Sequence, residues 1–302
     1  MRPSLFSDEN PVAQLVLTII TCLSCLFLSV SLGSLLSYLF YHVPPADLQS
    51  ELENAQNVPL QKFFQLVQGV GFFMIPPLIL GKVFSGSSTG YLKLNNVPSV
   101  GRFSLVFLIV LFAIPVVNLI AGLNSMIRLP QSMSDIQNYI DQTSKTYQTI
   151  TESFMKVNTL QGLASNLLIV AIIPALGEEF LFRGVLQRIF SNWTRNVHWG
   201  ILISSFVFSA IHMEFYGFFP RWILGIMFGY FLIWSGSLWL PILAHFLNNA
   251  IAVITYYLIS NGLIKENMAD IGSTTDFLPF TIICCLFTGA GIYLLYKKKN
   301  SF

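Results

Sequence analysis

The sequence has 302 residues, of which 54% are hydrophobic and only 10% are charged, and its net charge is +2. A soluble domain carries about 25% charged residues, so this composition cannot cover a surface that faces water. It also excludes disordered, collagen-like and disulfide-rich secreted proteins, and the small net charge gives no basic footprint for nucleic acid. The composition therefore indicates an all-α, polytopic protein embedded in the lipid bilayer.

Long apolar blocks follow one another along the chain, and none shows the alternation that a β-barrel strand requires. Because a spanning helix needs about 20 mostly apolar residues, the blocks predict about eight transmembrane helices. Gly225 and Gly229, four residues apart, are typical of a face at which two membrane helices pack closely. The predicted spans are 12–40, 63–83, 103–126, 160–187, 199–218, 222–235, 237–259 and 276–296.

Between the third and fourth blocks, the segment 128–160 is polar for its length. Met133, Ile136, Tyr139 and Ile140 recur in it at helical spacing, which predicts one amphipathic helix on the outer face of the membrane. The chain is interpreted as a single membrane domain in three parts. These are three helices with the external segment over 1–159, a catalytic core over 160–260, and a last helix with a basic tail over 261–302.

The charges in the loops predict the orientation of the protein. With the N-terminus in the cytoplasm, nine of the sixteen Lys and Arg residues fall on the cytoplasmic side and six fall on the outer side. Ten of the fourteen acidic residues fall on the outer side. Since short cytoplasmic loops carry an excess of Lys and Arg, we expect a multi-pass protein of the cell membrane with both termini in the cytoplasm.

Three charged side chains interrupt the fourth apolar block, namely Glu178, Glu179 and Arg183. A charge near the bilayer centre costs about 2.5–3.5 kcal/mol on the insertion scale, so each of them needs a reason. Glu179 and Arg183 are four residues apart and share a helix face, whereas Glu178 points about 100° away. We expect Glu179 and Arg183 to form an ion pair, structural or functional, and Glu178 to face a cavity.

Two further spans carry polar residues at a similar depth, with His212 in the fifth and both His245 and Asn249 in the seventh. At about 1.5 Å per residue they lie with Glu178 in the middle of the bilayer, towards its cytoplasmic half, which predicts a shared hydrated pocket. A buried Glu and a His can deprotonate a water, and an Asn or His N–H can stabilise an oxyanion. Glu178, His212 and His245 are also a candidate ligand set for a catalytic Zn²⁺. Both routes predict hydrolysis, for example of an amide.

These residues form three ordered motifs on separate spans: Glu178-Glu179-x-x-x-Arg183, Phe208-x-x-x-His212 and His245-x-x-x-Asn249. The set resembles the motifs of the CPBP intramembrane protease family. That family includes the type II CAAX prenyl endopeptidases and the bacterial Abi proteins, which act in bacteriocin processing and immunity. The resemblance covers about residues 160 to 260.

The resemblance implies an eight-helix membrane endopeptidase whose active site opens towards the cytoplasm. Its substrate would be a membrane-associated or lipidated peptide or protein. Carried over by position, Glu178 would activate the water, and His212 would assist it or bind a metal. His245 and Asn249 would form the oxyanion site, and Arg183 would orient Glu179. The same residues serve a zinc-dependent mechanism or a metal-independent glutamate mechanism.

Two other functions would use the same residues. A non-catalytic immunity or scaffolding member of the family would act through binding alone. An ion-coupled transporter also needs acids and histidines inside the membrane, but it is expected to carry an inverted repeat with broken helices in matching positions. The sequence shows no such repeat, so the endopeptidase is the favoured function.

Overall fold

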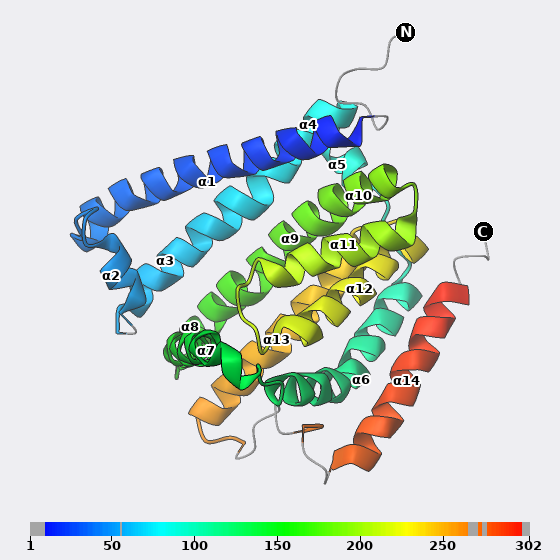
Figure 1. Cartoon of the computed structure of the whole chain (residues 1–302). Coiled ribbons are helices and arrows are strands. Elements are labelled where there is room, and N and C mark those ends of the chain that lie inside the picture. Colours follow the sequence, from blue (N-terminus) through cyan, green and yellow to red (C-terminus); the bar gives the residue numbers. More distant parts are fainter. Residues whose placement is uncertain (1–9, 55, 265–270, 274–276, 298–302) are drawn as a thin grey trace.

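The computed structural model describes residues 10–54, 56–264, 271–273 and 277–297, and every regular element within these ranges is helical (Figure 1). Seven of the described helices are long and apolar enough to cross a membrane. This confirms an all-α, polytopic membrane protein. The seven run over Pro11–Tyr41, Val58–Ser85, Val100–Ser125, Leu160–Thr194, Phe218–Ser235, Trp239–Ser260 and Leu278–Lys297.

Some spans consist of several consecutive elements. The second contains α3 (Val58–Gln68), η1 (Gly69–Met74) and α4 (Ile75–Ser85). The fourth, called here the central helix, contains α8 (Leu160–Asn166), η3 (Leu167–Ile172), α9 (Ile173–Glu178), η4 (Glu179–Leu186) and α10 (Gln187–Thr194), and both η segments in it are π-helical. The others are α1 (Pro11–Tyr41), α6 (Val100–Ser125), α12 (Phe218–Ser235), α13 (Trp239–Ser260) and α14 (Leu278–Lys297). The shorter elements are α2 (Leu48–Glu53), α5 (Ser88–Tyr91), η2 (Gln131–Met133), α7 (Ser134–Met155) and α11 (Val197–Ala210).

The predicted fifth span, 199–218, is wrong in its length. Helix α11 has 14 residues and ends at Ala210. At 1.5 Å per residue it is about 21 Å long, which is shorter than a hydrocarbon core of about 30 Å. The chain turns after it, with Met213 in the left-handed region at φ 52°. Ile211, Met213 and Phe215 keep apolar residues in this turn, so a hydropathy window does not reveal where the helix ends.

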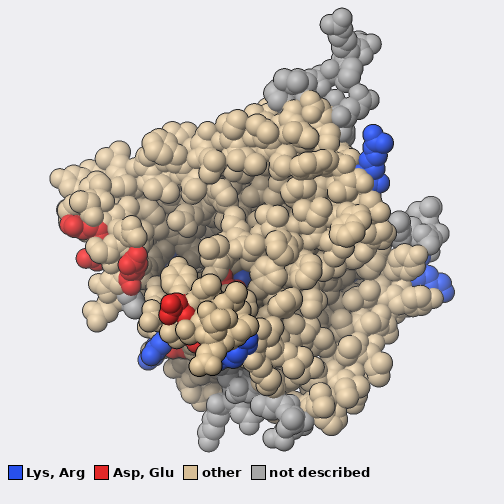
Figure 2. Space-filling view, viewed as in Figure 1, with Lys and Arg blue, Asp and Glu red and all other residues tan. Residues whose placement is uncertain are grey.

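When α11 is counted with the seven spans, successive helices alternate in direction and therefore define two opposite faces (Figure 1). The face called here the terminal face holds the start of α1, the end of α14 and the turns 86–99, 195–196 and 236–238. The opposite face, called the α7 face, holds α2, the segment 126–159 and the loop 211–217. Acidic side chains gather over α2 and α7, whereas the surface over α1 is uncharged (Figure 2).

Helix α7 corresponds to the predicted amphipathic segment and lies across the ends of the spans (Figure 1). Of the four apolar positions that predicted it, Ile140 is half-buried, whereas Met133, Ile136 and Tyr139 are exposed, the last two by 53% and 70%. Its C-terminal end packs inwards instead, where Phe154 and Met155 are buried against Ile169 and Val253. Helix α7 is therefore fixed to the bundle at one end and presents apolar side chains outwards at the other.

Helix α12 packs closely against the central helix through its two predicted glycines. A Cβ atom at Gly229 would lie 2.8 Å from both Gln187 Oε1 and a methyl carbon of Ile201. The carbonyl oxygens of Gly225 and Gly229 accept hydrogen bonds from Arg183 Nη2 at 3.1 Å and Gln187 Nε2 at 3.2 Å. The small residues thus let polar side chains of the central helix reach the backbone of α12.

Candidate active site

One cavity of about 480 Å³ lies on the α7 side of the bundle, between the central helix, α12 and α13. Four of the six predicted site residues line it: Glu178, His212, His245 and Asn249. The other two, Glu179 and Arg183, are buried, and their contacts link them to His245. The structure therefore brings together the residues that the sequence placed at a common depth. The cavity is also lined by Tyr147, Thr151, Met155, Phe208, Gly217, Arg221, Phe228 and Asn248.

The expected pair of Glu179 and Arg183 is present. Arg183 Nη1 donates to Glu179 Oε1 at 2.8 Å, and both side chains are fully buried. The guanidinium lies 4.4 Å from the ring centroid of Phe208 and 5.5 Å from that of Phe228. Because buried charges need partners on several sides, the opposite charge, the Gly225 carbonyl and the two aromatic rings together stabilise this arginine.

His245 extends this pair towards the cavity. Its Nδ1 donates to the same oxygen, Glu179 Oε1, at 2.8 Å. Since an ionised carboxylate only accepts hydrogen bonds, this contact fixes the proton on Nδ1 and leaves Nε2 towards the cavity. Nε2 lies 3.8 Å from Glu178 Oε2, which is too long for a direct hydrogen bond and leaves room for a shared water. Arg183, Glu179 and His245 therefore form a buried series that ends beside Glu178.

His212 lies in the turn that follows α11, and its Nδ1 donates to the carbonyl oxygen of Phe208 at 2.8 Å. A carbonyl oxygen only accepts, so this contact leaves Nε2 unprotonated and available in the cavity. The ring of Phe208 also packs edge-on against His212 and His245, at 5.2 Å and 5.9 Å between centroids. The four-residue spacing of Phe208 and His212 thus has a local cause, which the sequence alone did not indicate.

Asn249 has a backbone partner in the central helix. Pro174 has no N–H to donate to the carbonyl of Val170 four residues earlier, and Asn249 Nδ2 donates to that carbonyl at 3.0 Å. Its neighbour Asn248, which also lines the cavity, donates from Nδ2 to Asn249 Oδ1 at 3.2 Å. Asn249 therefore joins α13 to the central helix, and Asn248 adds a second carboxamide that the three sequence motifs do not include.

The predicted Zn²⁺ ligand set was compared with this geometry. Both imidazoles have the orientation common in metal ligands, because each holds its Nδ1 proton in a hydrogen bond and leaves Nε2 free. Among the residues that the structure describes, however, no three His, Cys, Asp or Glu side chains are placed so that they could hold a metal ion. Glu178, His212 and His245 thus do not fit a resident ion in this geometry, and zinc dependence stays a prediction.

A second charged pair, absent from the sequence-based site, lies at the edge of the cavity. Arg221 Nη2 donates to Glu214 Oε2 at 3.0 Å, and Arg221 lines the cavity itself. In the sequence, Arg221 lies between the predicted spans 199–218 and 222–235 and is one of the six Lys and Arg residues assigned to the outer side. Only the packing of the loop 211–217 brings it to the site.

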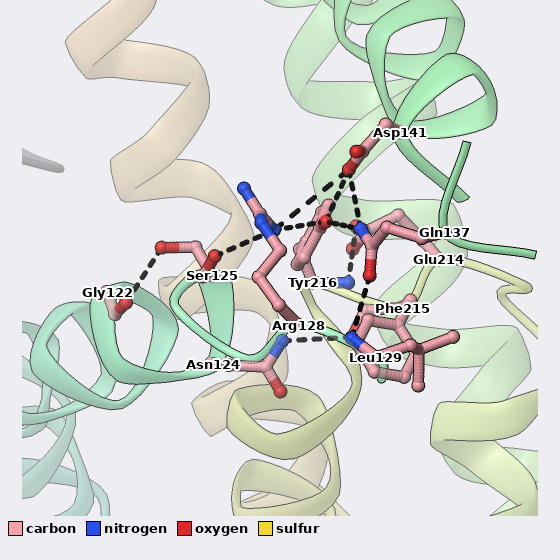
Figure 3. Close-up of polar contacts among 10 residues, drawn as sticks. All are labelled: Gly122, Asn124, Ser125, Arg128, Leu129, Gln137, Asp141, Glu214, Phe215 and Tyr216. Atoms are coloured by element: carbon pink, nitrogen blue, oxygen red, sulfur yellow. Dashed lines mark hydrogen bonds and ion pairs between the residues drawn. The ribbon is translucent and has the colours of Figure 1, made fainter. Parts of the chain in front are cut away.

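The loop 211–217, which contains His212, is bonded to two other elements (Figure 3). The hydroxyl of Tyr216 donates to Asp141 of α7 and accepts hydrogen bonds from Arg128 and Gln137. Asn124 of α6 donates from Nδ2 to the carbonyl of Phe215 at 2.9 Å. Hydrogen bonds from Tyr216 and then Gln137 hold the pKa of Asp141 below its usual value of 3.8.

The cavity lies towards the α7 face and not towards the terminal face. Its lining includes Tyr147 and Thr151 of α7, and Gly217 just before α12. Because the two faces are opposite, two expectations cannot both hold: cytoplasmic termini and a cavity that opens to the cytoplasm. The choice between them is a question of membrane orientation.

Comparisons with known proteins concern the part of the chain that carries this site. Residues 160–251 match the family model described as type II CAAX prenyl endopeptidase Rce1-like. A Bacillus subtilis (strain 168) protein, described as uncharacterized protein YpbD, is 31% identical over 93 residues, which are 28% of this chain and 43% of that protein. No solved structure matches the chain significantly. The family match over residues 160–251 confirms the resemblance to the CPBP intramembrane protease family that the three motifs predicted.

Proposed function

We propose that this protein is an intramembrane endopeptidase that hydrolyses a peptide bond of a membrane-associated or lipidated peptide or protein. The observation that carries the proposal is the buried series Arg183–Glu179–His245, which ends at Glu178 in a cavity. A structural ion pair needs only two of these residues. Keeping a second carboxylate and a second histidine in the same cavity is costly in a membrane, and water activation accounts for both.

In the first step, Glu178 accepts a proton from a water that is bound beside it in the cavity. The water oxygen forms a bond to the carbonyl carbon, and the carbonyl electron pair moves onto the oxygen. His212 Nε2, left unprotonated by the bond to Phe208, accepts a hydrogen bond from the other O–H group of the water and orients it. N–H groups of Asn248 and Asn249 stabilise the oxyanion, which extends the predicted role of Asn249 to its neighbour.

In the second step, the tetrahedral intermediate collapses and the bond between carbon and nitrogen breaks. The protonated Glu178 gives its proton to the departing nitrogen, so the products are a carboxyl group and an amine. The role of Arg183 and Glu179 is to hold the His245 ring and its tautomer during both steps. Neither side chain touches the substrate in this scheme, so both are positioning residues.

Cleavage by the purified, reconstituted protein tests the proposal. Glu178→Gln removes the base and keeps the shape of the side chain, so we expect cleavage of a farnesylated CAAX tetrapeptide to fall by at least about a thousandfold. Glu152→Gln, a matched change of an exposed acid on α7, is expected to keep normal activity. Thermal unfolding measured on the same samples shows whether each variant is folded.

Turnover by folded Glu178→Gln at the normal rate would contradict the proposed mechanism. No cleavage by the unmodified protein, together with a cellular phenotype that survives Glu178→Gln and His212→Ala combined, would support the non-catalytic alternative. Activity measured with and without a chelator decides the predicted zinc dependence separately.

A further inference from the structure

A second cavity, of about 330 Å³, lies towards the terminal face of the bundle. Its walls come from the turn that follows α5, the C-terminal part of the central helix, the start of α11 and the end of α12. Among the described residues it shares no lining side chain with the active-site cavity. The proposed hydrolysis therefore gives this space no role.

The charged side chains in the described lining of this cavity are both cations. They are Lys93 and Arg188, and no Asp or Glu is among the described residues that line it. The guanidinium of Arg188 lies 4.4 Å from the ring centroid of Tyr91, which holds it at the wall. Partial burial, and then the charge of Arg188, lower the pKa of Lys93, so the two positive charges lie near each other. A space bordered by two cations favours an anion as its occupant.

The position of Lys93 is fixed by its backbone. Its φ of 54° lies in the left-handed region, which is unfavourable for a residue with a side chain and persists where the surroundings determine it. The N–H of Lys93 donates to the carbonyl of Gly90 at 3.2 Å, and its own carbonyl accepts from the N–H of Leu238 at 3.3 Å. The turns 86–99 and 236–238 thus hold the residue whose ammonium group borders the cavity.

The inner lining contributes buried polar atoms that lack partners. Arg183 and Gln187 both line the cavity and are 1% and 2% exposed. Arg183 Nε, a donor, and Gln187 Oε1, an acceptor, make no hydrogen bond to any described residue. Such atoms are costly to leave unpaired, so a bound molecule is expected to satisfy them. An acceptor beside two cations matches a ligand that carries a hydroxyl group next to its anionic group.

The depth of the cavity places its cations at the level of the lipid headgroups. The central helix has 35 residues and is about 50 Å long, so it extends about 10 Å beyond each side of a hydrocarbon core of about 30 Å. Arg188 precedes Thr194, the last residue of this helix, by six positions or about 9 Å. Apolar side chains of Leu92, Leu232 and Ile233 complete the lining. Charge at headgroup depth beside apolar walls suits a lipid better than a fully soluble anion.

We propose that this cavity binds the phosphate group of an anionic phospholipid. Lys93 and Arg188 are the cationic contacts, and Gln187 accepts a hydrogen bond from a hydroxyl group of the lipid headgroup. Phosphatidylglycerol carries both the phosphate and the hydroxyl groups. The site does not depend on the proposed endopeptidase function, because neither cation lines the active-site cavity.

Native mass spectrometry of the full chain in detergent measures the binding of each lipid directly. The protein is titrated with phosphatidylglycerol, with phosphatidylcholine, and with glycerol 1-phosphate, which is the headgroup without acyl chains. We expect phosphatidylglycerol to bind about tenfold more tightly than either of the others. Lys93→Gln and Arg188→Gln should each weaken its binding about fivefold. Val197→Phe, which narrows the cavity without changing its charge, should weaken it as well.

The role of Gln187 is tested with a matched lipid. Phosphatidylmethanol has the charge of phosphatidylglycerol but no headgroup hydroxyl, so we expect it to bind about threefold to tenfold less tightly. Equal affinity for these two anionic lipids would contradict the hydrogen bond to Gln187.

Lys82→Gln is the matched control, because Lys82 is an exposed cation in the last turn of α4 that does not line the cavity, and lipid binding should survive this change. Equal affinities for phosphatidylglycerol and phosphatidylcholine, or equal losses in Lys93→Gln and Lys82→Gln, would overturn the site. Binding of glycerol 1-phosphate as tightly as the lipid would replace the lipid with a soluble phosphate ester. Glu178→Gln should bind phosphatidylglycerol normally, so this site and the proposed endopeptidase can fail separately.

Discussion

At the scale of single residues, the two adjacent glutamates differ completely in their surroundings. Glu179 is fully buried between Arg183 and His245, whereas Glu178 lines the cavity and lies 3.8 Å from His245 Nε2. A helix turns by about 100° between neighbours, so one side chain points into the bundle while the next points into the cavity. The same chemical group is therefore held between two buried partners at one position and faces the cavity at the next.

This difference predicts that changing each glutamate to glutamine lowers the stability of the protein by very different amounts. Glu179→Gln removes the charge that compensates buried Arg183, so we expect the free energy of unfolding to fall by about 3–5 kcal/mol. Glu178→Gln should change it by less than about 1 kcal/mol, because Glu178 has no direct partner at hydrogen-bond distance in the described structure. Unfolding of the two variants in the same detergent measures both values. Equal losses would contradict the assignment of separate roles.

The two neighbouring asparagines predict a similar separation. Asn249→Ala leaves the Val170 carbonyl without its side-chain donor, so we expect a loss of about 1–3 kcal/mol in stability. Asn248→Ala breaks only the bond to Asn249, so its stability should change little while kcat falls if it donates to the oxyanion. Comparison of Tm and kcat for the two variants tests these expectations. A lower Tm for Asn248→Ala together with a lower kcat for Asn249→Ala would exchange the roles of the two residues.

How much of the site the sequence predicts depends on whether a residue's partner is near in sequence. Glu179 and Arg183 are four residues apart, and the cost of burying charge indicates them at once. The bond from His245 to Glu179 joins residues 66 positions apart, so only the packing of α13 against the central helix creates it. Arg221 was missed for the same reason, since its charge between two predicted spans looks ordinary until the loop 211–217 is folded.

At the scale of elements, the approach of α12 to the central helix depends on two glycines. Gly225 and Gly229 place backbone carbonyls within reach of Arg183 and Gln187. The sequence predicted this packing face from spacing alone, because small residues recur where membrane helices approach closely. It did not predict that side chains would donate across the contact, which requires knowledge of the neighbouring helix.

Alanine at Gly229 tests this contact without touching a cavity residue. Its Cβ would lie 2.8 Å from Gln187 Oε1, so the helices must separate and we expect a loss of about 1–3 kcal/mol in stability. Gly289→Ala in α14 is the matched control, since a Cβ there meets nothing within 4 Å. Thermal unfolding of both variants measures the effect. If Gly229→Ala is as stable as Gly289→Ala, α12 can move away from the central helix without a loss of stability.

The hydrogen bonds between α7 and the loop 211–217 predict that the stability of this contact depends on pH. The pKa of Asp141 is below 3.8 in the folded protein, so its contribution to stability is present above the unfolded pKa and is lost as pH falls through the lower folded value. We expect hydrogen exchange in the loop to quicken, relative to its intrinsic rate, as pH falls below about 4. Asp141→Asn should show the quicker exchange at neutral pH as well. If the unmodified protein and Asp141→Asn respond to pH in the same way, a group other than Asp141 causes the quicker exchange.

At the scale of the whole molecule, composition alone predicts the class correctly. A chain with 10% charged residues and long apolar blocks has to cross a membrane, and the structure supplies seven helices able to do so among the residues it describes. The predicted fifth span, residues 199–218, differs in length: α11 runs from the terminal face towards the α7 face but ends at Ala210, because hydropathy measures how apolar a segment is and not where its backbone turns. The backbone N–H and C=O groups of a turn can form hydrogen bonds within the protein. The hydropathy of the segment then gives no sign that the helix has ended.

The terminal face and the α7 face lie on opposite sides of the bundle. The orientation of the protein therefore determines the side of the membrane on which the cavity opens. If the Lys and Arg distribution sets the orientation, the terminal face is cytoplasmic and the cavity is reached from outside. Single cysteines at Lys145 on α7 and at Thr89 on the terminal face, in a chain without its native cysteines, test this with a membrane-impermeant maleimide on intact cells. We expect labelling at 145 and none at 89. The reverse result would restore the cytoplasmic opening and place both termini outside.

The short helix α11 has a consequence for the lipid around the protein. Its length of about 21 Å falls about 9 Å short of the hydrocarbon core, so the annular lipids beside it face a hydrophobic mismatch. A bilayer meets such a mismatch by thinning locally, which brings its headgroups and their water towards the turn that carries His212. For the lipidated substrate proposed above, the deformation shortens the path between the membrane surface and the cavity. The membrane itself then forms part of the entrance.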